Sequence, residues 1–476
     1  MIIKRLMQQC VSRIVFFLYM LGEKQYKYNT SAENCDKIGQ MKIRTSCKGA
    51  YPPMDMTFFP APLKGTVAAP ASKSEAHRRM ICAGLTRGAT TLKGFMDSAD
   101  MAATARCLKA MGASLCQEGD CLTITGYAKK PCKLPVLDCG ESGSTLRFFV
   151  PIALALTKGG VFRMHGRLGQ RPMDVYRDLF VPRGVRWRMG VGCDGAAELT
   201  VKGELEAGHY VLPGNVSSQF VSGLMFALPL LEEDSTLTVQ QPVESAGYIN
   251  MTVEALTQSG IQLEELTPFS WRIAGNQQYK AQDGALAGDY SQAAVLLCAA
   301  ALGQDVTVTG LERITTQGDR AVMKHLMALG AKVQEDASGV TVTADGLNGA
   351  ALDMSGCPDI APILALVCQL AQGESRLTGC GRLRLKECDR LAATVETLNL
   401  LGGKARAEGD VIVINGVEKL SGDVTLPDHN DHRMVMLGAV AASVADMPVT
   451  VSGVEALNKS WPEFINVYQN LGGIAE

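Results

Sequence analysis

Short polar segments rich in basic and hydroxyl side chains interrupt the apolar stretches of this chain. The segment PASKSEAHRR contains Lys73, Ser74 and Arg78 just before an apolar run, and GESGSTLRF contains Gly143 in the same kind of setting. Arginine binds phosphate and carboxylate groups with two parallel hydrogen bonds, lysine acts as a mobile point charge, and glycine lets a backbone approach a ligand. These residue types together predict a site for an anionic ligand.

Further basic clusters follow along the chain. They comprise Arg167 and Arg171 in GRLGQRP, six charged residues in GRLRLKECDRL (Arg382, Arg384, Lys386, Glu387, Asp389 and Arg390), Arg433 in HNDHRM and Lys459 in NKSWPEF. A solvated helix face would explain the GRLRLKECDRL cluster if it stood alone. At least eight cations nevertheless fall in corresponding or adjacent parts of the chain, although the net charge is only -2. We therefore expect one local cleft that binds a strongly anionic ligand.

Two acidic residues lie among these cations and are candidates for proton transfer. Asp359 stands in GCPDIAP, at the start of a hydrophobic run, and Glu387 stands inside the basic cluster. A first-turn aspartate alone is usually part of helix capping chemistry. A carboxyl group beside a bound anion can act as a general acid or base. Hydroxyl and amide groups complete the candidate set: Ser217, Ser218 and Gln219 in NVSSQF, which alone resembles an ordinary helix start, and Ser245 and Tyr248 in ESAGYI.

The elements that must position these residues repeat six times, with a period of roughly 72 residues. A glycine that ends an amphipathic stretch and precedes a strand recurs at Gly112, Gly184, Gly260, Gly330, Gly402 and Gly472, at intervals of 72, 76, 70, 72 and 70. Polar residues open strongly apolar stretches in phase with it, near Ser74, Ser144, Ser218, Ser291, Ile360 and His432. Repeats of this length indicate stacked supersecondary units.

Each unit has the pattern of an apolar helix, a short strand, an amphipathic helix and two alternating strands. A helix that is apolar on every side must be buried on every side. Three such helices can share one core with sheets outside, so six units predict two similar α/β lobes with a cleft between them. The chain of 476 residues is also too long for a single core.

Bulk composition excludes several classes of function. The chain is 47% hydrophobic and 20% charged, and its net charge of -2 argues against nucleic acid or acidic membranes as partners. Its 15 cysteines include no CxxC pair and it has six histidines, which favours reduced cytosolic thiols and no metal site. There is no P-loop and no GxGxxG after a strand, so no nucleotide cofactor is expected. We expect residues 1–55, whose apolar run 14–21 only superficially resembles a signal peptide, to be a disordered extension or a mis-assigned start.

From about Leu63 onwards the chain contains, in order, the motifs SKS…R, GxSGSTLR, RxxxRP, SSQF, SxxYI, PD, LKECDRL and NDHRM, followed by a late lysine. In these motifs it resembles the 5-enolpyruvylshikimate-3-phosphate synthase family. The resemblance implies the enolpyruvyl transferase fold, an inverse α/β prism of six βαβαββ units, three per lobe, with buried apolar helices and sheets outside. It places lobe 1 at 56–71 plus 288–476 and lobe 2 at 72–287, with chain crossings near Ser72 and Gly288.

The resemblance also implies a reaction: transfer of the enolpyruvyl group of phosphoenolpyruvate to the 5-hydroxyl of shikimate 3-phosphate, in the shikimate pathway. It implies that Asp359 is the proton acceptor and Glu387 the proton donor, and that Lys73 touches both substrates. The implied ligands of shikimate 3-phosphate are Lys73, Ser74, Arg78, Ser217, Ser218, Gln219, Ser245, Tyr248, Asp359 and Lys386. The implied ligands of phosphoenolpyruvate are Lys73, Gly143, Arg167, Gln219, Arg390, Arg433 and Lys459. A cytoplasmic monomer without metal or cofactor is implied as well.

Two positions depart from the family pattern, since Glu141 and Arg382 stand where many members have asparagine. Two alternative functions remain open at this point. The sister family transfers enolpyruvate to UDP-N-acetylglucosamine but usually carries a reactive cysteine in the loop equivalent to 166–172, where HGRLGQRP has none. A non-catalytic anion-binding scaffold on the same fold predicts that the acids are missing, yet Asp359 and Glu387 are present.

Overall fold

A computed structural model describes residues 54–127 and 133–476. The extension predicted at 1–55 therefore lies outside the described residues, apart from its last two positions. From Met54 onwards the described residues belong to one unit. None of the helices within these two ranges has the length and apolar character needed to cross a membrane.

The six glycines that recur with the repeat, from Gly112 to Gly472, are called the marker glycines here, and they occupy equivalent places in the backbone. Each follows the end of an amphipathic helix, or of the short 3-10 turn after it, and precedes a strand, as predicted. Their φ angles lie between +76° and +102°. Glycine adopts this left-handed conformation without the steric penalty of a side chain, and it ends a helix by turning the chain away. The periodic signal in the sequence thus corresponds to six similar helix-to-strand turns.

The described strands form six four-stranded sheets with the same pairing pattern. In each sheet the first two strands are parallel and the remaining pairs are antiparallel. Three sheets consist of β14 (Gly284–Ala285), β3 (Ala89–Lys93), β5 (Cys121–Thr125) and β4 (Ser114–Glu118); β6 (Val136–Asp138), β7 (Gly159–Met164), β9 (Ala197–Lys202) and β8 (Arg186–Val191); and β10 (His209–Pro213), β11 (Ser235–Gln240), β13 (Ser270–Ile273) and β12 (Leu263–Thr267). The other three consist of β2 (Lys64–Ala68), β15 (Asp305–Thr309), β17 (Gly339–Thr343) and β16 (Lys332–Asp336); β18 (Ala351–Asp353), β19 (Glu374–Thr378), β21 (Val411–Asn415) and β20 (Lys404–Glu408); and β22 (Val424–Leu426), β23 (Val449–Val451), β1 (Met56–Phe59) and β24 (Ile474–Ala475).

Two kinds of helix alternate along the chain. The apolar helices are α2 (Lys73–Leu85), α4 (Gly143–Thr157), α6 (Ser218–Ala227), α8 (Tyr290–Ala301), α10 (Ala361–Gln369) and α12 (His432–Ser443). The amphipathic helices are α3 (Ala99–Ala110), α5 (Asp174–Phe180), α7 (Ala246–Gln258), α9 (Ala321–Ala328), α11 (Arg390–Leu400) and α13 (Phe464–Asn470). Short 3-10 helices are η2 (Leu168–Gln170), η3 (Val181–Arg183), η4 (Leu228–Leu230), η5 (Gly318–Arg320), η6 (Pro358–Ile360), η7 (Gly381–Leu385) and η8 (Val454–Lys459).

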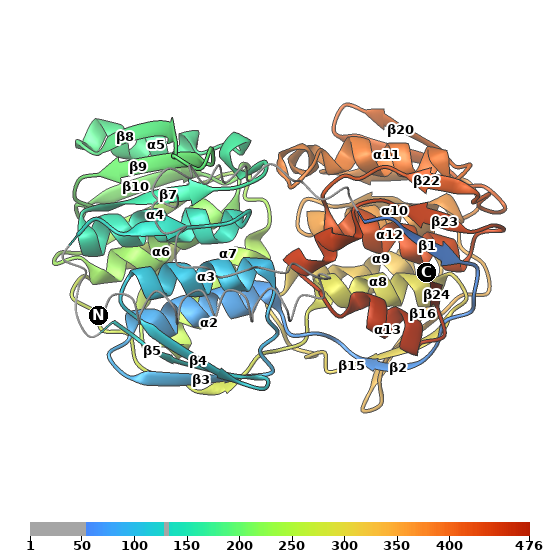
Figure 1. Cartoon of the computed structure of the whole chain (residues 1–476), viewed down its shortest axis with the longest axis horizontal. Helices are drawn as coiled ribbons and strands as arrows, with labels where there is room; N and C mark the ends of the chain where they lie inside the picture. The colour runs from blue at the N-terminus through green and yellow to red at the C-terminus, as the bar shows by residue number, and fades with distance from the viewer. Residues whose placement is uncertain (1–53, 128–132) are drawn as a thin grey trace, which may run out of the picture. The chain divides into compact units, whose positions relative to one another are not determined.

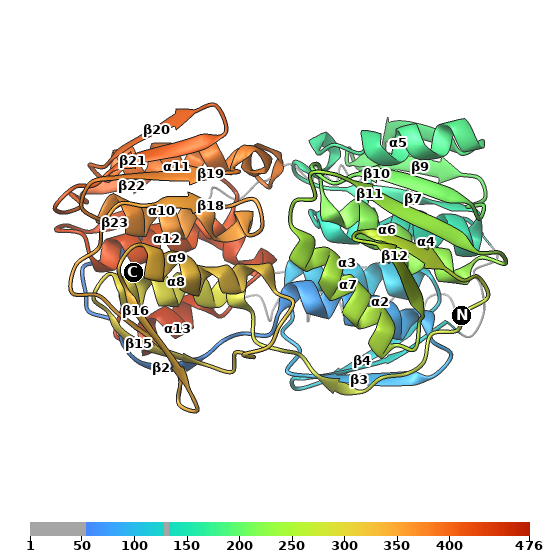
Figure 2. The same ribbon diagram turned by 180° about the vertical axis from the view of Figure 1, so that it is seen from behind.

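The apolar helices form the centres of two separate clusters of buried residues. One cluster contains Phe58, Leu63 and residues between 290 and 471, and the other contains residues between 76 and 286. We call the surrounding parts lobe 1 and lobe 2. Every residue of α8 and of α12 is buried, as a helix that is apolar on all sides requires. Figures 1 and 2 show the helices of each lobe stacked between its strands, so the predicted α/β class is confirmed.

The chain passes between the lobes twice, and the two passages are paired with each other. Ala71 and Gly288 form an antiparallel bridge, the Ser72 amide donates to the Ala287 carbonyl at 2.7 Å, and the Asp289 amide donates to Pro70 at 2.8 Å. The helices α2 and α8 begin directly after these passages. The paired passages therefore fix the start of one apolar helix in each lobe. The residue limits of the lobes stay a prediction.

Lobe 1 is assembled from distant parts of the sequence. Strand β1 lies between β23 and β24, and β2 pairs in parallel with β15. In Figure 1 these two early strands, in blue, run among the yellow and red elements of this lobe.

Candidate active site

One pocket, with about 1020 Å³ of unoccupied space open to solvent, receives residues from all six polar helix openings. The openings supply Lys73, Gly143, Ser218, Ser291 and Asp359, and the sixth supplies both His432 and Arg433. Side-chain caps on the first backbone amides are typical of these helix starts: Ser72, Ser142, Ser217, Asp289 and Asp431 each accept such a bond. The positive ends of the helices therefore point toward a common space, which favours an anionic ligand.

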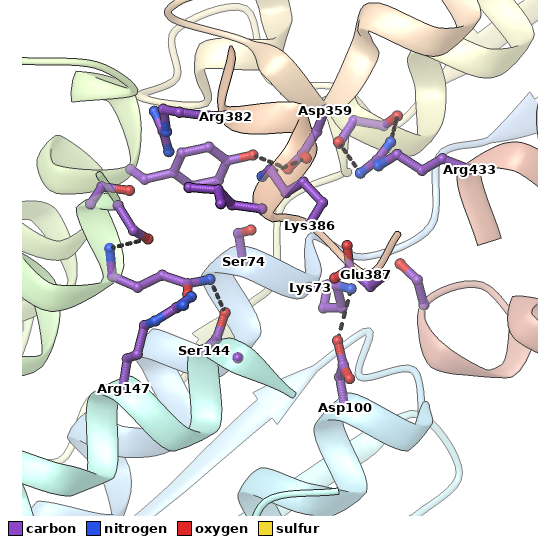
Figure 3. A pocket seen from close by; sticks show the side chains of 18 of the residues that line it. Lys73, Ser74, Asp100, Ser144, Arg147, Asp359, Arg382, Lys386, Glu387 and Arg433 are labelled. Atoms are coloured by element: carbon purple, nitrogen blue, oxygen red, sulfur yellow. Dashed lines mark hydrogen bonds and ion pairs between the residues drawn. The ribbon is translucent and has the colours of Figure 1, made fainter. Parts of the chain in front are cut away.

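Side-chain charges reinforce this preference. The pocket wall contains eight lysine and arginine side chains, namely Lys73, Arg78, Arg147, Arg171, Arg382, Lys386, Arg390 and Arg433. It contains four carboxylates, namely Asp100, Asp289, Asp359 and Glu387. Figure 3 shows several of these side chains pointing into the same space from different elements. The excess of cations suits a ligand that carries more than one phosphate or carboxylate group.

Asp359 lies in η6, at the start of α10, and is held by two cations. Its Oδ1 accepts hydrogen bonds from Lys386 Nζ at 2.8 Å and from Arg390 Nη1 at 2.7 Å. Burial raises the pKa of Asp359, but the neighbouring cations, led by Lys386 and Arg433, outweigh it and hold the pKa well below the ordinary value. The carboxylate is therefore ionised and able to accept a proton from a bound hydroxyl group.

Glu387 lies on the loop between η7 and α11. Its Oε2 accepts from Arg390 Nη2 at 2.7 Å, and its Oε1 is 3.7 Å from Arg171 Nη1. Burial raises the pKa of Glu387, but Arg390 and Arg171 lower it further than burial raises it, so the carboxyl group is ionised. A bound anion would offset these positive charges and allow Glu387 to take up a proton.

Arg390 connects the two candidate acids to a third carboxylate. Its side chain is only 2% exposed, and Nε donates to Asp431 Oδ2 at 2.6 Å while Nη2 reaches Asp431 Oδ1 at 3.3 Å. The same guanidinium binds Asp359 and Glu387. Because a guanidinium is planar and offers donors in fixed directions, this arrangement fixes the spacing of Asp359 and Glu387.

Lys73 is oriented by an aspartate from the neighbouring helix. Its Nζ donates to Asp100 Oδ2 at 3.0 Å, and its backbone amide donates to Asp289 Oδ2 at 3.0 Å. Figure 3 shows Lys73 directed toward Asp100. The lysine is thereby positioned at the boundary of the two lobes.

Gln219 is clamped between two residues of α4. Its Oε1 accepts from Arg147 Nη1 at 2.6 Å, and its Nε2 donates to Ser144 Oγ at 2.8 Å. Ser217 and Ser218 precede it at the start of α6 and line the same wall. Two hydroxyl groups, a helix N-terminus and Arg147 together form a cradle with donors for a phosphate group.

Arg78 contributes to the wall mainly by fixing other groups. Its guanidinium donates to Ser74 O at 2.7 Å, to Tyr248 O at 2.9 Å and to Thr252 Oγ1 at 2.8 Å. The guanidinium also lies 5.4 Å from the centre of the Phe148 ring. These contacts bring α2 and α7 together, so that Ser74 and Tyr248 face the pocket.

The Tyr248 hydroxyl bridges two carboxyl groups. It lies 3.0 Å from Asp319 Oδ2 and 3.1 Å from Asp359 Oδ2. Burial, together with the charge of Asp359, raises the pKa of Asp319 to about 6. A phenol has one hydrogen to donate, so both contacts are satisfied when Asp319 carries a proton and donates it to the phenol oxygen.

The structure brings thirteen of the sixteen predicted site residues to the pocket wall, all except Arg167, Ser245 and Lys459. Arg167 is exposed next to η2. Ser245 is buried, with φ +54° just before α7, and its Oγ accepts from Arg382 Nη1 at 2.7 Å. Arg382 itself, one of the two departures from the family pattern, does line the pocket. Lys459 Nζ donates to Glu141 Oε2 and to the Asn430 carbonyl, both at 2.8 Å.

In the loop after β7, Arg171 rather than Arg167 reaches the pocket. A Cβ atom at Gly143 would lie 2.7 Å from Arg171 Nη1, so the arginine in its present position packs directly against the glycine backbone. The short helix η2 lies between the two arginines and turns the first of them outward. Sequence spacing alone did not distinguish two arginines four positions apart in one loop.

Other pocket residues were not predicted as ligands, including Asp100, Arg147, Asp289, Ser291, Gln292 and His432. Asp100 lies in the first turn of α3 and Asp289 caps α8, so both have the pattern of ordinary helix starts. Arg147 stands in the GESGSTLRF motif, which was the available signal. Burial, followed by the charge of Lys73, lowers the pKa of His432 well below the ordinary value, so its ring is neutral. Within the described ranges, no group of three or more His, Cys, Asp or Glu side chains is arranged to hold a metal ion.

Known structures identify the class of protein that this fold represents. EPSP synthase from Acinetobacter baumannii superposes with a TM-score of 0.73 at 23% identity, covering 89% of this chain and 99% of that one. The enolpyruvyl transferase NikO from Streptomyces tendae gives a TM-score of 0.71 at 16% identity, with 89% and 98% coverage. The chain therefore has the enolpyruvyl transferase fold, as predicted.

Sequence relatives identify the family. Residues 59–468 match the family model described as EPSP synthase (3-phosphoshikimate 1-carboxyvinyltransferase). A 3-phosphoshikimate 1-carboxyvinyltransferase from Clostridium botulinum is 38% identical over 421 residues, 87% of this chain and 96% of the relative. A protein of the same name from Clostridioides difficile is 36% identical over 428 residues, with 88% and 97% coverage. The chain belongs to the EPSP synthase family, which confirms the predicted resemblance.

Proposed function

We propose that this pocket transfers the enolpyruvyl group of phosphoenolpyruvate to the 5-hydroxyl of shikimate 3-phosphate, the reaction of the family in the shikimate pathway. The observation that supports it best is the sharing of Arg390 by Asp359 and Glu387 inside a ring of cations. The reaction needs one group to accept a proton, a second to donate one, and fixed positive charge around a polyanionic transition state. All three requirements are met by neighbouring side chains.

In the first step the 5-hydroxyl attacks C2 of phosphoenolpyruvate and loses its proton to Asp359. Glu387 donates a proton to C3, the methylene carbon, which becomes a methyl group in the tetrahedral ketal. Phosphate then leaves, and the Glu387 carboxylate takes a proton back from the methyl group, which restores the double bond. Lys73, held by Asp100, is placed to support the departing phosphate.

The cations that lower the pKa of Glu387 are compatible with its role as proton donor. Phosphoenolpyruvate brings a carboxylate and a phosphate to the cations that lower the pKa of Glu387. The negative charge of the ligand raises that pKa, which favours the protonated form of the acid when its substrate is present. Donor binding and acid activation are thereby coupled through the charge of Arg390 and Arg171.

The ligand assignments follow the distribution of the wall residues. Shikimate 3-phosphate is assigned to lobe 2, Asp359 and the GRLRLKECDRL segment, with the ligands Lys73, Ser74, Arg78, Ser217, Ser218, Gln219, Ser245, Tyr248, Asp359 and Lys386. Phosphoenolpyruvate is assigned to Lys73, Gly143, Gln219, Arg390, Arg433 and Lys459, with Arg171 in the place first given to Arg167. Ser245 acts through Arg382, to which it is hydrogen-bonded. We further propose that the chain works as a cytoplasmic monomer without nucleic acid or membrane partners, in keeping with its net charge of -2.

The test is phosphate release from phosphoenolpyruvate by the purified chain, with shikimate 3-phosphate or UDP-N-acetylglucosamine as acceptor. Release only with shikimate 3-phosphate is the expected result, and release only with the sugar nucleotide would refute the assigned acceptor. Asp359→Ala and Glu387→Gln are expected to lose turnover by about 10²–10⁴-fold, the usual contribution of general acid–base catalysis, while still binding shikimate 3-phosphate. Turnover near that of the unmodified chain in either variant would contradict the role of that residue. No release with either acceptor, from folded protein that binds shikimate 3-phosphate, would indicate a binding scaffold.

A further inference from the structure

Glu141 belongs to lobe 2 but its carboxylate is bound by residues of lobe 1. It directly precedes Ser142, the N-cap of α4, two positions before Gly143 of the pocket wall. Its Oε2 accepts from Lys459 Nζ at 2.8 Å and from Asn430 Nδ2 at 3.2 Å. Lys459 Nζ also donates to the Asn430 carbonyl at 2.8 Å. One carboxylate therefore holds a lysine of the opposite lobe.

The backbone around Glu141 leaves room for this carboxylate. A Cβ atom on Gly166 would lie 2.6 Å from Glu141 Cδ and within 2.9 Å of both carboxylate oxygens. Gly166 also has φ +53°, a conformation that disfavours residues with side chains. The loop that carries Arg171 therefore begins with a glycine, and its lack of a side chain leaves space for the Glu141 carboxylate.

The pairing removes a cation from the pocket. Lys459 is the one predicted phosphoenolpyruvate-binding lysine outside the wall, and two of its three N–H donors are already engaged. The group that engages it is a carboxylate, the same chemical group that phosphoenolpyruvate carries.

We propose that Glu141 sets the affinity for the donor substrate by occupying Lys459 as the donor's carboxylate would. Phosphoenolpyruvate must displace this carboxylate from the lysine or bind next to an uncompensated negative charge. Either event weakens donor binding relative to a neutral side chain at the same position. The inference rests on the proposed function, in which Lys459 is a donor ligand.

This competition should not change the affinity for the acceptor substrate, shikimate 3-phosphate. Among the residues assigned to shikimate 3-phosphate, Ser217 and Ser218 lie at the start of α6 and Lys386 pairs with Asp359, and none of them contacts Glu141. The expected effect of Glu141 is therefore specific to one substrate. That specificity separates the proposal from a general loss of stability.

The experiment is Glu141→Gln, which keeps the shape of the side chain and removes its charge. The ion pair is partly exposed, with 11% of the Lys459 side chain and 32% of the Glu141 side chain accessible. Partly exposed pairs contribute up to about 1 kcal/mol, which corresponds to about a fivefold change in affinity. We expect the KM for phosphoenolpyruvate to fall about fivefold and the KM for shikimate 3-phosphate to stay unchanged.

Two controls make the test specific. Glu335→Gln removes a carboxylate whose Oε2 pairs with Arg320 at the same 2.8 Å distance, and neither residue lines the pocket, so both KM values should stay unchanged. In a Lys459→Gln background the competition for the lysine is absent and only direct repulsion by the carboxylate remains, so the Glu141 substitution should change donor binding less than in the unmodified chain. An unchanged or raised KM for phosphoenolpyruvate in Glu141→Gln would overturn the proposal.

A direct binding measurement separates this proposal from the proposed function. Calorimetry of phosphoenolpyruvate binding does not require turnover or a particular acceptor. About fivefold tighter binding to Glu141→Gln supports the competition even if the chain uses a different acceptor. Equal or weaker binding refutes it even if the chain releases phosphate with shikimate 3-phosphate.

Discussion

The most informative perturbation is at Asp431, which holds Arg390 through Nε and Nη2. Its side chain is fully buried, and it accepts bonds from Arg390 at 2.6 and 3.3 Å and from the backbone amide of Arg433 at 2.9 Å. Asparagine is as good an N-cap as aspartate, so Asp431→Asn removes the charge and keeps the helix cap. Asp431→Ala removes both, and comparison of the two variants separates charge from capping.

The magnitude follows from the contacts of Arg390. Removal of one partner from a buried ion pair costs about 3–5 kcal/mol of folding free energy. Arg390 keeps Asp359 and Glu387 at 2.7 Å, so it is not left without a counter-charge, and we expect about 3 kcal/mol for Asp431→Asn. Loss of the cap adds about 1 kcal/mol, which gives about 4 kcal/mol for Asp431→Ala.

The assay is urea unfolding followed by far-ultraviolet circular dichroism, because the midpoint and slope give the free energy of unfolding. The same variants should show a raised KM for phosphoenolpyruvate, since the guanidinium is free to turn when Nε loses its acceptor. A free energy within 1 kcal/mol of the unmodified chain for Asp431→Asn, with an unchanged donor KM, would refute the reasoning. Asp359 and Glu387 alone would then fix Arg390.

Two further predictions concern neighbouring groups. The pKa of Asp319 is raised from 3.8 to about 6, so between these pH values the folded chain binds a proton that the unfolded chain has released, and stability falls as pH rises. Asp319→Asn should flatten this fall when melting temperatures are measured between pH 4 and 7. An unchanged slope would exclude Asp319 as the source of the pH dependence. Arg171→Lys should raise the KM for phosphoenolpyruvate, because lysine cannot reproduce a planar guanidinium next to Gly143, whereas Arg167→Lys should leave this KM unchanged. Steady-state kinetics of the two variants test this, and the reverse result would contradict the assignment of Arg171 as the donor ligand.

Local rules explain why much of the fold could be predicted from the sequence. Positive φ at the marker glycines and burial of uniformly apolar helices depend on residues close to one another in the chain. The period of the pattern then places the polar openings in equivalent positions. Asp359 and Glu387 could be predicted as pocket residues because their motifs are specific and their segments are short.

Contacts between distant residues explain what the sequence could not predict. Asp431 has the pattern of a simple helix cap and does cap α12, but its second role depends on Arg390, 41 positions earlier. The choice of Arg171 over Arg167 depends on which way one short helical turn faces. The binding of Glu141 to Lys459 joins positions 318 residues apart, on different lobes. Neither spacing nor composition carries this information.

The construction of lobe 1 has a consequence for how the chain folds as it is synthesised. All the strands of the three sheets of lobe 2 have been made once residue 285 is added, whereas β1 pairs with a strand 393 positions later. At about 5–20 residues per second, β1 waits roughly 20–80 s for its partner. We infer that lobe 2 folds first and that the MTFF segment of β1 stays unpaired in the nascent chain. The last sheet to form thus closes around β1, the first strand in the part of the chain that the structure describes.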